Sequence, residues 1–310
     1  MFYFNNTYGL PNATLKLNAG VTVDNNGKNF PVGKVSGSGT LAGSGSYIFG
    51  TNGEDFSMTA PCTSSVIKKG AGTMRVVTAG KITGSIIVEE GGFHFSGITS
   101  GTLFNGTKPI TGNGSSVLLG QAYLTSLTIN SGSTLKPRAT LSETSAGTII
   151  ATGTIAVNEG ATLDMLLSAS KQSKLQGKWV SVKGILKVTL AEGYTPAAGD
   201  SFTLWEATNS FSGTPTFDLP VLPDNLAWDT SELLAATGVL KVVVGSSIKA
   251  IAPDATVQCE VYTTNGQKVA QFEAPKNKVE ENLQTVSSDN RTLIVRMVAG
   301  NRMEVKKVIR

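Results

Sequence analysis

A short turn motif recurs along this chain and limits the folds that the chain can adopt. Each copy has an aliphatic residue, then Asn or Glu, any residue and Gly, and a second apolar-alternating stretch follows it. The copies are Leu17-Asn18-Ala19-Gly20, Val88-Glu89-Glu90-Gly91, Ile129-Asn130-Ser131-Gly132 and Val157-Asn158-Glu159-Gly160. Repetition of one unit is the signature of proteins in which each unit buries its apolar face against the next. The sequence therefore predicts a stack of repeated coils.

Glycine spacing gives the expected length of one coil. Gly70, Gly91, Gly112, Gly132 and Gly153 are 20 or 21 residues apart, which suits two or three short strands with corners between them. Gly supplies the positive φ that a corner needs, and an Asn side chain can bond nearby backbone or an Asn in a neighbouring coil. We therefore expect an all-β fold, a parallel β-helix with about 20 residues per coil.

One copy of the motif contains an additional glycine. Gly92 follows Gly91 and shifts the strand pattern by one residue. Because side chains alternate between the two faces of a strand, this shift predicts that Phe93 and Phe95 point into the core. The same alternation predicts that His94 points to solvent.

Glycine content also divides the chain. Of the 35 glycines, 33 lie before residue 246. We expect β-helix coils over residues 1–168, a β-rich closing segment over 169–245 that caps the solenoid, and a separate domain over 246–310. In that last domain, alternating residues around Asn265-Gly266 predict one hairpin, and residues 293–298 and 303–309 predict a second.

Composition and charge exclude several classes of protein. Charged residues make up 15% of the chain, and residues 246–310 hold +3 of the +4 net charge. No basic stripe is interleaved with aromatic residues, so we expect no nucleic-acid partner. No apolar run reaches the length of a transmembrane segment. Cys62 and Cys259 are too few for a disulfide framework, and with one histidine we expect neither a metal site nor a cofactor.

The first residues do not read as a signal peptide. Met1-Phe2-Tyr3-Phe4-Asn5-Asn6 has no basic start, no apolar segment and no small-residue cleavage site. Either the protein is cytoplasmic, or the chain begins inside a longer, exported polypeptide. The rest of the sequence favours the second, so we expect an extracellular or outer-surface location.

Two segments point to a known repeat family. Ser36-Gly37-Ser38-Gly39-Thr40-Leu41 and Lys69-Gly70-Ala71-Gly72-Thr73-Met74 resemble the signature of autotransporter-associated β-strand repeats. Residues 193–204, 211–213, 226–231 and 238–240, which contain Gly199-Asp200-Ser201-Phe202 and Trp228-Asp229, look like the segment that closes such repeats in bacterial surface proteins. This resemblance implies a right-handed parallel β-helix in an exported protein.

The tail carries a second resemblance. Val261-Tyr262, Asn265-Gly266-Gln267-Lys268-Val269 and the ending Lys306-Lys307-Val308-Ile309-Arg310 resemble the C-terminal sorting domains of Bacteroidetes secreted proteins. That family implies a small β-sandwich that directs export or surface attachment. The tail lacks the upstream Pro-Asn-Pro of the family, and Thr292-Leu293-Ile294 stands where the family has Gly-x-Tyr.

Polysaccharide lyases and polygalacturonases share the β-helix fold, so activity has to be judged from residues. Hydrolysis needs two carboxylates in one groove, and a lyase needs acidic Ca²⁺ ligands with a basic group nearby. Glu90 and Glu159 share a motif position but lie about two coils apart at this coil length. Glu54-Asp55 reads as a solvated turn, and His94 has no triad partner. We therefore predict no catalytic, cofactor-binding or metal-binding residue and no enzyme activity.

Two functions follow from this pattern. The first is a non-catalytic stalk or scaffold at the outer surface of a bacterial cell, with adhesive contacts to surface glycans or other cell-surface proteins. The alternative is a carbohydrate-binding or lyase-like, polysaccharide-degrading protein that uses a groove of the solenoid. In that alternative Trp179, Trp205 and Trp228 would form a sugar platform, whereas in the first they close the core.

Overall fold

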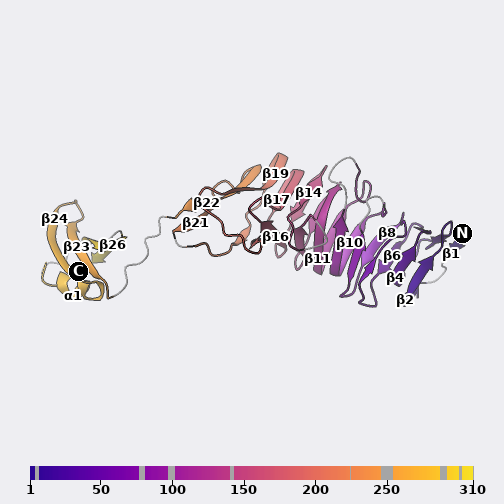
Figure 1. The fold of residues 1–310 in the computed structure, drawn as a ribbon, viewed down its shortest axis with the longest axis horizontal. Helices are drawn as coiled ribbons and strands as arrows, with labels where there is room; N and C mark the ends of the chain where they lie inside the picture. The colour runs from indigo at the N-terminus through magenta and orange to yellow at the C-terminus, as the bar shows by residue number, and fades with distance from the viewer. Residues whose placement is uncertain are drawn as a thin grey trace. The chain divides into compact units, whose positions relative to one another are not determined.

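The computed structural model describes residues 1–3, 7–76, 81–96, 102–139, 143–223, 225–245, 254–286, 292–299 and 302–309. The chain divides into two compact units, Met1–Val244 and Gly245–Arg310 (Figure 1). The second unit begins one residue before the boundary predicted from glycine content. Each unit has a hydrophobic core of its own.

The first unit consists of strands and the segments between them. Its strands are β1 (Phe2–Tyr3), β2 (Leu10–Leu17), β3 (Thr22–Asp24), β4 (Phe30–Gly37), β5 (Thr40–Ala42), β6 (Ser46–Phe49), β7 (Phe56–Ser57), β8 (Ser65–Lys68), β9 (Thr73–Val76), β10 (Ile86–Ser96), β11 (Ile110–Leu124), β12 (Leu127–Ile129), β13 (Thr134–Pro137), β14 (Thr148–Ala151), β15 (Thr154–Val157), β16 (Thr162–Leu167), β17 (Lys174–Val182), β18 (Ile185–Leu190), β19 (Ser201–Ser212), β20 (Thr216–Asp218), β21 (Leu226–Asp229) and β22 (Thr237–Val244).

Parallel pairing dominates this unit, which confirms an all-β fold with parallel strands. β4 pairs with β6, β6 with β8 and β8 with β10, each in parallel. The pairing partner lies one coil further along the chain. Val66 pairs with Ile86, 20 residues on, whereas Leu127 pairs with Ile155, 28 residues on. The coil length is therefore not constant, unlike the glycine spacing.

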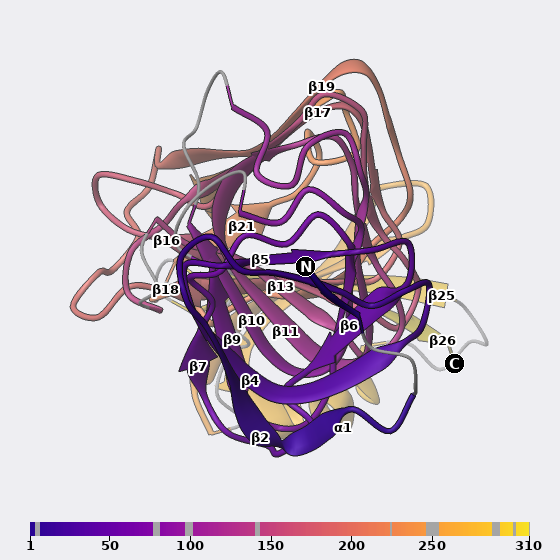
Figure 2. The same cartoon turned by 90° about the vertical axis from the view of Figure 1, so that its right-hand side faces the viewer.

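Strands that pair with one another in successive coils form columns along the stack, and some long strands belong to more than one column. β11 pairs with β12, β13 and β14 along its length, and β17 pairs with both β14 and β15. Because such a strand belongs to more than one column, the hydrogen-bonded network closes on itself. Figure 2 looks along the stack and shows the coils lying over one another.

Alternation places the expected apolar side chains in one continuous core. Phe93 and Phe95 are fully buried, with ring centroids 5.6 Å apart, so the phase shift caused by Gly92 is confirmed. The core cluster runs from Leu17 to Val242 through every coil.

Glycines with positive φ form the corners between strands. Not every glycine of the 20- or 21-residue spacing is one of them. Gly91 and Gly132 have positive φ, and a Cβ there would lie 2.4 Å from the Gly70 oxygen and 2.7 Å from the Gly114 oxygen. In the coil between them, Gly114 rather than Gly112 has positive φ. Backbone of the adjacent coil thus leaves no room for a side chain, which is why the corners require glycine.

Asparagine side chains join three successive corners. The Asn158 amide donates to the Asn130 side-chain oxygen at 2.7 Å, and the Asn130 amide donates to the Asn113 side-chain oxygen at 2.7 Å. The expected contact between motif asparagines of neighbouring coils is confirmed. Asn113 was not recognised as a member of the motif because Gly112 precedes it in place of an aliphatic residue.

Parallel pairing continues past residue 168, where the sequence pattern predicts the closing segment. β18 pairs in parallel with β16, and β20 with β18. The arrangement changes at β22, which pairs antiparallel with both β19 and β21. An antiparallel strand interrupts the parallel ladder, so this end of the stack is closed by a different pairing geometry.

The second unit is one antiparallel sheet with a short helix. β23 (Thr256–Thr263), β24 (Lys268–Pro275), β25 (Thr292–Ala299) and β26 (Arg302–Ile309) are ordered β24-β23-β25-β26. Between β24 and β25 lie η1 (Lys276–Lys278) and α1 (Val279–Leu283). Both predicted hairpin pairings are present; Gly300 and Asn301 of the second turn lie outside the described residues.

The expected β-sandwich is wrong for the described part of this unit, which holds a single sheet. Val279 and Leu283 are four residues apart and both are buried. That spacing puts them on one face of a helix rather than on alternate faces of a strand. A helix therefore packs where the sandwich would need a second sheet.

Candidate functional site

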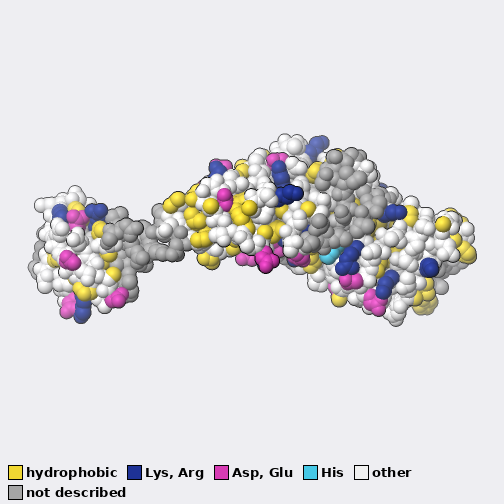
Figure 3. Space-filling view, viewed as in Figure 1, with side chains coloured by type: hydrophobic (Ala, Val, Ile, Leu, Met, Phe, Trp, Pro, Cys, Tyr) yellow, Lys and Arg dark blue, Asp and Glu magenta, His cyan; other side chains and the backbone are white. Residues whose placement is uncertain are grey.

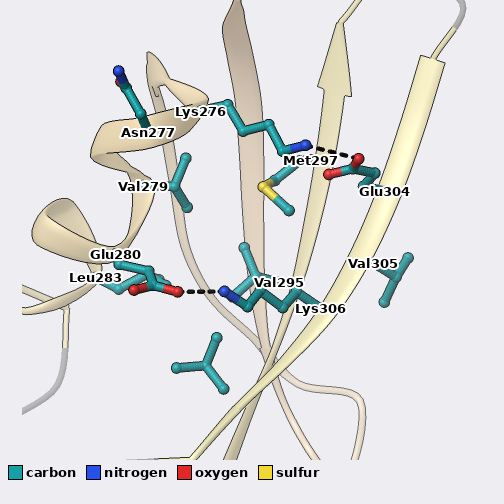
Figure 4. Close-up of a pocket in the computed structure, with 11 residues that line it drawn as sticks. Lys276, Asn277, Val279, Glu280, Leu283, Val295, Met297, Glu304, Val305 and Lys306 are labelled. Carbon is teal, nitrogen blue, oxygen red and sulfur yellow. Dashed lines mark hydrogen bonds and ion pairs between the residues drawn. The ribbon is translucent and has the colours of Figure 1, made fainter. Parts of the chain in front are cut away.

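A cleft lies in the second unit between α1 and the strands β25 and β26 (Figure 4). Its volume is about 450 Å³. The floor is apolar and includes the buried Val279, Leu283, Val295 and Met297. We call it the helix cleft. It is hollow because a single short helix covers a face that a complete second layer would fill.

Two ion pairs cross the helix cleft. Lys276 contacts Glu304 at 2.8 Å, and Lys306 contacts Glu280; Figure 4 shows both pairs bridging from the helical segment to β26. Glu304 and Lys306 share the inner face because they lie directly opposite Met297 and Val295. The hydrogen bond from Lys306 holds the pKa of Glu280 below its usual range.

The chemistry available in the helix cleft is limited. The ionisable side chains that line it are used in the two ion pairs, and the remaining lining side chains are apolar apart from Asn277. Charged side chains that point inward on an edge strand are a common protection against pairing with another chain. The arrangement fits a structural role or an apolar contact, not acid–base catalysis.

A second hollow lies where three corners of the stack meet the surface. Its volume is about 390 Å³, and its lining residues are Glu159, Gly160, Lys183, Gly184, Ile185, Gly213, Thr214 and Thr216. A Cβ on Gly184 or Gly213 would lie 2.2 Å from backbone oxygen of the preceding coil. The hollow thus follows from corners that have no side chains, and it holds one carboxylate and one ammonium group.

His94 does not point freely to solvent, contrary to expectation. It is half-buried, because its strand lies between Arg75 of β9 and Leu119 of β11. Burial, followed by the Arg75 charge, lowers the pKa of His94 below its usual value. Its Nδ1 is buried and has no hydrogen-bond partner within the described structure. A neutral imidazole without an orienting carboxylate lacks the partner that a general base needs.

Glu54 and Asp55, which the sequence predicts in a solvated turn, contact residues of neighbouring coils. Asp55 accepts hydrogen bonds from the Thr73 backbone at 2.8 Å and from Arg75 at 3.0 Å. The Thr73 N–H, then Arg75, lowers the pKa of Asp55. Glu54 pairs with Lys34. These carboxylates therefore join coils instead of sharing a ligand.

Glu90 and Glu159 are not brought together. Glu90 lies in β10 opposite Ser115 of β11, whereas Glu159 follows β15 and lines the corner hollow. Over the described part of the chain, no group of three or more His, Cys, Asp or Glu side chains is arranged to hold a metal ion.

The three tryptophans do not form a common platform. Trp205 is fully buried, stacks on Phe211 with centroids 4.8 Å apart, and donates to the Ala235 oxygen. Trp228 is half-buried and donates to the Pro220 oxygen at 2.8 Å. Trp179 is 43% exposed, with the Lys178 ammonium 5.5 Å from its ring centroid. Trp179 is thus the most exposed of the three tryptophans.

Lys68 is a charged residue that is buried in the first unit. Its side chain is fully buried, and Nζ donates to the oxygens of Lys69, Gly70 and Glu90 at 2.8, 2.7 and 3.1 Å. Burial lowers the pKa of Lys68 to about 8. Its inward position in the alternation after Val66 is the signal that predicts burial.

Arg138 forms a second buried polar cluster that the sequence did not reveal. It is 1% exposed and donates to the Asp164 carboxylate at 3.1 Å and to the Asp164 backbone oxygen at 2.9 Å. Asp164 also accepts from Thr189 at 2.8 Å. Because these residues come from successive coils, the cluster joins coils inside the protein.

Exposed apolar side chains gather at the closed end of the stack. Val221 is 96% exposed, Val244 71% and Leu234 53%, and Figure 3 shows hydrophobic atoms concentrated over β21 and β22. Elsewhere on the first unit, opposite charges lie beside one another (Figure 3).

Cys62 and Cys259 are both buried, unpaired and in different units. Burial raises the pKa of the Cys62 thiol to about 12, which keeps it protonated and unreactive. Within the described ranges, no helix has the length and apolar character needed to cross a membrane. No protein-family model matches the chain, and a search of curated proteins finds no match either.

Proposed function

We propose that this chain is a non-catalytic stalk or scaffold of an exported bacterial surface protein. Its first unit is a right-handed parallel β-helix that separates functional parts of a longer polypeptide. Its second unit is a domain of the sorting type that attaches or exports the whole. Surface glycans or other surface proteins are the expected partners of its outer face.

The ladder formed by Asn113, Asn130 and Asn158 carries this proposal. The recurring polar residues of the motif are used to connect successive corners, and glycine fills the positions where coils approach most closely. A residue that repeats because the stack needs it is explained without any ligand. The recurring residues of the motif thus have a structural use within the stack.

The surface charges support the same function. Arg75 pairs with Asp55 at 3.0 Å and Lys69 with Glu89 at 2.9 Å, in each case across neighbouring coils. A carboxylate that is paired with its own basic side chain is poorly suited to bind Ca²⁺ or to share a proton with a second carboxylate. Exposed ion pairs of this kind add little to the stability of the stack.

The sorting role of the second unit has its own support. The unit folds around its own core of Val257, Cys259, Val261, Val279, Leu283, Leu293, Val295 and Met297. A compact domain with a separate core can serve as a module for attachment without disturbing the stack.

Surface display tests the stalk. The chain is inserted between a membrane anchor and an epitope on a bacterium with a dense surface layer. We expect the epitope to become accessible to antibody, compared with a fusion that joins epitope and anchor directly. Equal accessibility would contradict the stalk. A glycan array on the same chain tests the alternative, because saturable binding that Trp179→Ala abolishes would favour a carbohydrate-binding protein.

A further inference from the structure

The helix cleft has the size and lining of a site for a small ligand. Ligand-binding cavities measure about 300–1,000 Å³ and combine an apolar lining with a few polar groups that orient the ligand. The helix cleft, at about 450 Å³, lies within this range. Its floor is buried, whereas the side chains of Lys306 and Glu280 are 56% and 70% exposed where the cleft opens to solvent (Figure 4).

The floor favours an aliphatic ligand over a flat ring. Val279 and Leu283 reach it from α1, and Val295 and Met297 reach it from β25. None of the described lining residues is aromatic, so a ring would find no partner on which to stack. Met297 has a flexible, unbranched side chain that adapts to the shape of a neighbouring group. An aliphatic chain therefore matches this floor best.

Lys306 supplies a charged group for one end of such a chain. Among the described residues its ion-pair partner is Glu280, and both side chains of this pair are largely exposed. Exposed ion pairs contribute little to stability, so an anion that takes the place of Glu280 beside Lys306 costs the protein little. The second pair across the cleft, Lys276–Glu304, is less exposed, at 25% and 21%. We expect that pair to remain intact.

The charge of the second unit favours an anionic ligand over a cationic one. Residues 246–310 contain ten Lys and Arg and seven Asp and Glu, a net charge of 10 − 7 = +3. A positive net charge raises the local concentration of anions around the domain. The lining itself is balanced, with two lysines and two glutamates, so the surrounding charge decides the sign.

We propose that the helix cleft binds an aliphatic carboxylate of medium chain length. The hydrocarbon chain lies on the apolar floor, and the carboxylate lies beside Lys306 in place of Glu280. This site goes beyond the stalk function and does not depend on it, because every lining residue belongs to the second unit.

Calorimetric titration of the 310-residue chain with decanoate at neutral pH, below the concentration at which decanoate forms micelles, tests the site. We expect one site per chain with a dissociation constant on the order of 10–100 μM. Decanol has the same chain without the charge and should bind more weakly, decylammonium more weakly still, and acetate not at all. Absence of saturable decanoate binding, or tighter binding of decylammonium, would overturn the proposal.

Two neighbouring lysines provide a matched pair of variants. Lys306 lines the cleft, whereas Lys307 lies opposite Ile294 on the other face of the sheet and does not line it. Lys306→Gln should weaken decanoate binding about threefold to tenfold and leave decanol binding unchanged. Lys307→Gln removes the same charge and should leave both unchanged. Equal effects of the two variants on decanoate would contradict a contact with Lys306.

Methyl NMR of methionine-labelled protein locates the ligand. The Met297 signal, assigned by its loss in Met297→Leu, should shift when decanoate is added. The signals of Met58, Met74 and Met165, which are buried in the first unit, should not shift. Decanoate binding without a change at Met297 would place the ligand elsewhere and overturn the proposal.

Vesicles separate a free acid from the acyl chain of a membrane lipid. We expect the chain to stay in solution when phosphatidylglycerol vesicles are sedimented. Sedimentation with the vesicles by a chain that does not bind decanoate would show that the cleft takes a lipid of the membrane, and it would overturn the proposal of a free carboxylate.

Discussion

Asn158 donates its side-chain amide to the side-chain oxygen of Asn130, 28 residues earlier in the chain, at 2.7 Å. Asn130 in turn donates to Asn113 at 2.7 Å. In both bonds, therefore, the donor is the asparagine later in the chain and the acceptor is the earlier one. The central residue makes both bonds, which makes it the most sensitive position of the ladder.

Replacing Asn130 with Ala should lower the free energy of unfolding by about 1–3 kcal/mol, because the change leaves hydrogen-bonding groups of two half-buried neighbours without their partner. Asn158→Ala removes a single bond of the ladder and should cost less. Urea unfolding monitored by circular dichroism provides the measurement. Asn12→Ala, at an exposed position of β2, is the control, and equal losses for Asn12 and Asn130 would contradict the ladder.

Two glycines of the same motif allow the cost of backbone strain to be measured apart from the cost of a steric clash between coils. Gly20 and Gly132 both have positive φ, +77° and +83°, but a Cβ at Gly132 meets the Gly114 oxygen at 2.7 Å and at Gly20 meets nothing. Both Ala variants should lose about 1 kcal/mol to strain. Gly132→Ala should lose about 1–3 kcal/mol more through overpacking. Equal chemical stability of the two variants would show that corner contacts contribute nothing.

Lys68 should make stability depend on pH in the alkaline range. Its pKa falls from 10.5 to about 8 on folding, so between these values the unfolded chain binds more protons than the folded chain. Stability should therefore rise as pH increases through this window, by about 3 kcal/mol at most. Urea unfolding from pH 7 to pH 10.5 measures the slope. Lys68→Met should remove this part of the slope, and an unchanged profile would mean that Lys68 is not buried as a cation.

Arg138 should be among the most sensitive charged residues of the first unit. Arg138→Met leaves the buried Asp164 carboxylate without its cation and should cost about 3–5 kcal/mol. Lys136→Met breaks the pair with Glu143, which is 60% exposed, and should cost less than about 1 kcal/mol. Thermal unfolding of both variants provides the comparison. A small loss for Arg138→Met would show that water reaches this cluster.

The repeated corners and the inward strand faces could be predicted because they follow from local rules. Gly91 and Phe93 obey φ preference and side-chain alternation, which the sequence displays directly. The change in coil length along the chain could not be predicted, because Gly112 and Gly153 continue the even spacing in the sequence, whereas Gly114 and Gly160 have the positive φ. Only the position of the adjacent coil distinguishes these glycines.

Burial of polar residues was the main gap in prediction from sequence. Lys68 and Arg138 are charged, and composition rules place such residues at the surface unless they have partners. One partner of Lys68, the Glu90 oxygen, and the ionic partner of Arg138, the Asp164 carboxylate, lie more than twenty residues away in the chain. The prediction that His94 points to solvent was wrong for the same reason. The strands on both sides of His94 come from other coils. Contacts between coils decide all three positions.

Turnover of polysaccharides tests the central claim most directly. The chain is incubated with pectins and other anionic polysaccharides, with and without Ca²⁺, and new unsaturated or reducing ends are measured. If the chain is a non-catalytic stalk, we expect no turnover above a control without the chain. Asp55, Glu54 and Glu89 each form an ion pair with a basic residue of another coil. Turnover that a single substitution such as Glu90→Gln or Glu159→Gln abolishes would contradict the non-catalytic stalk.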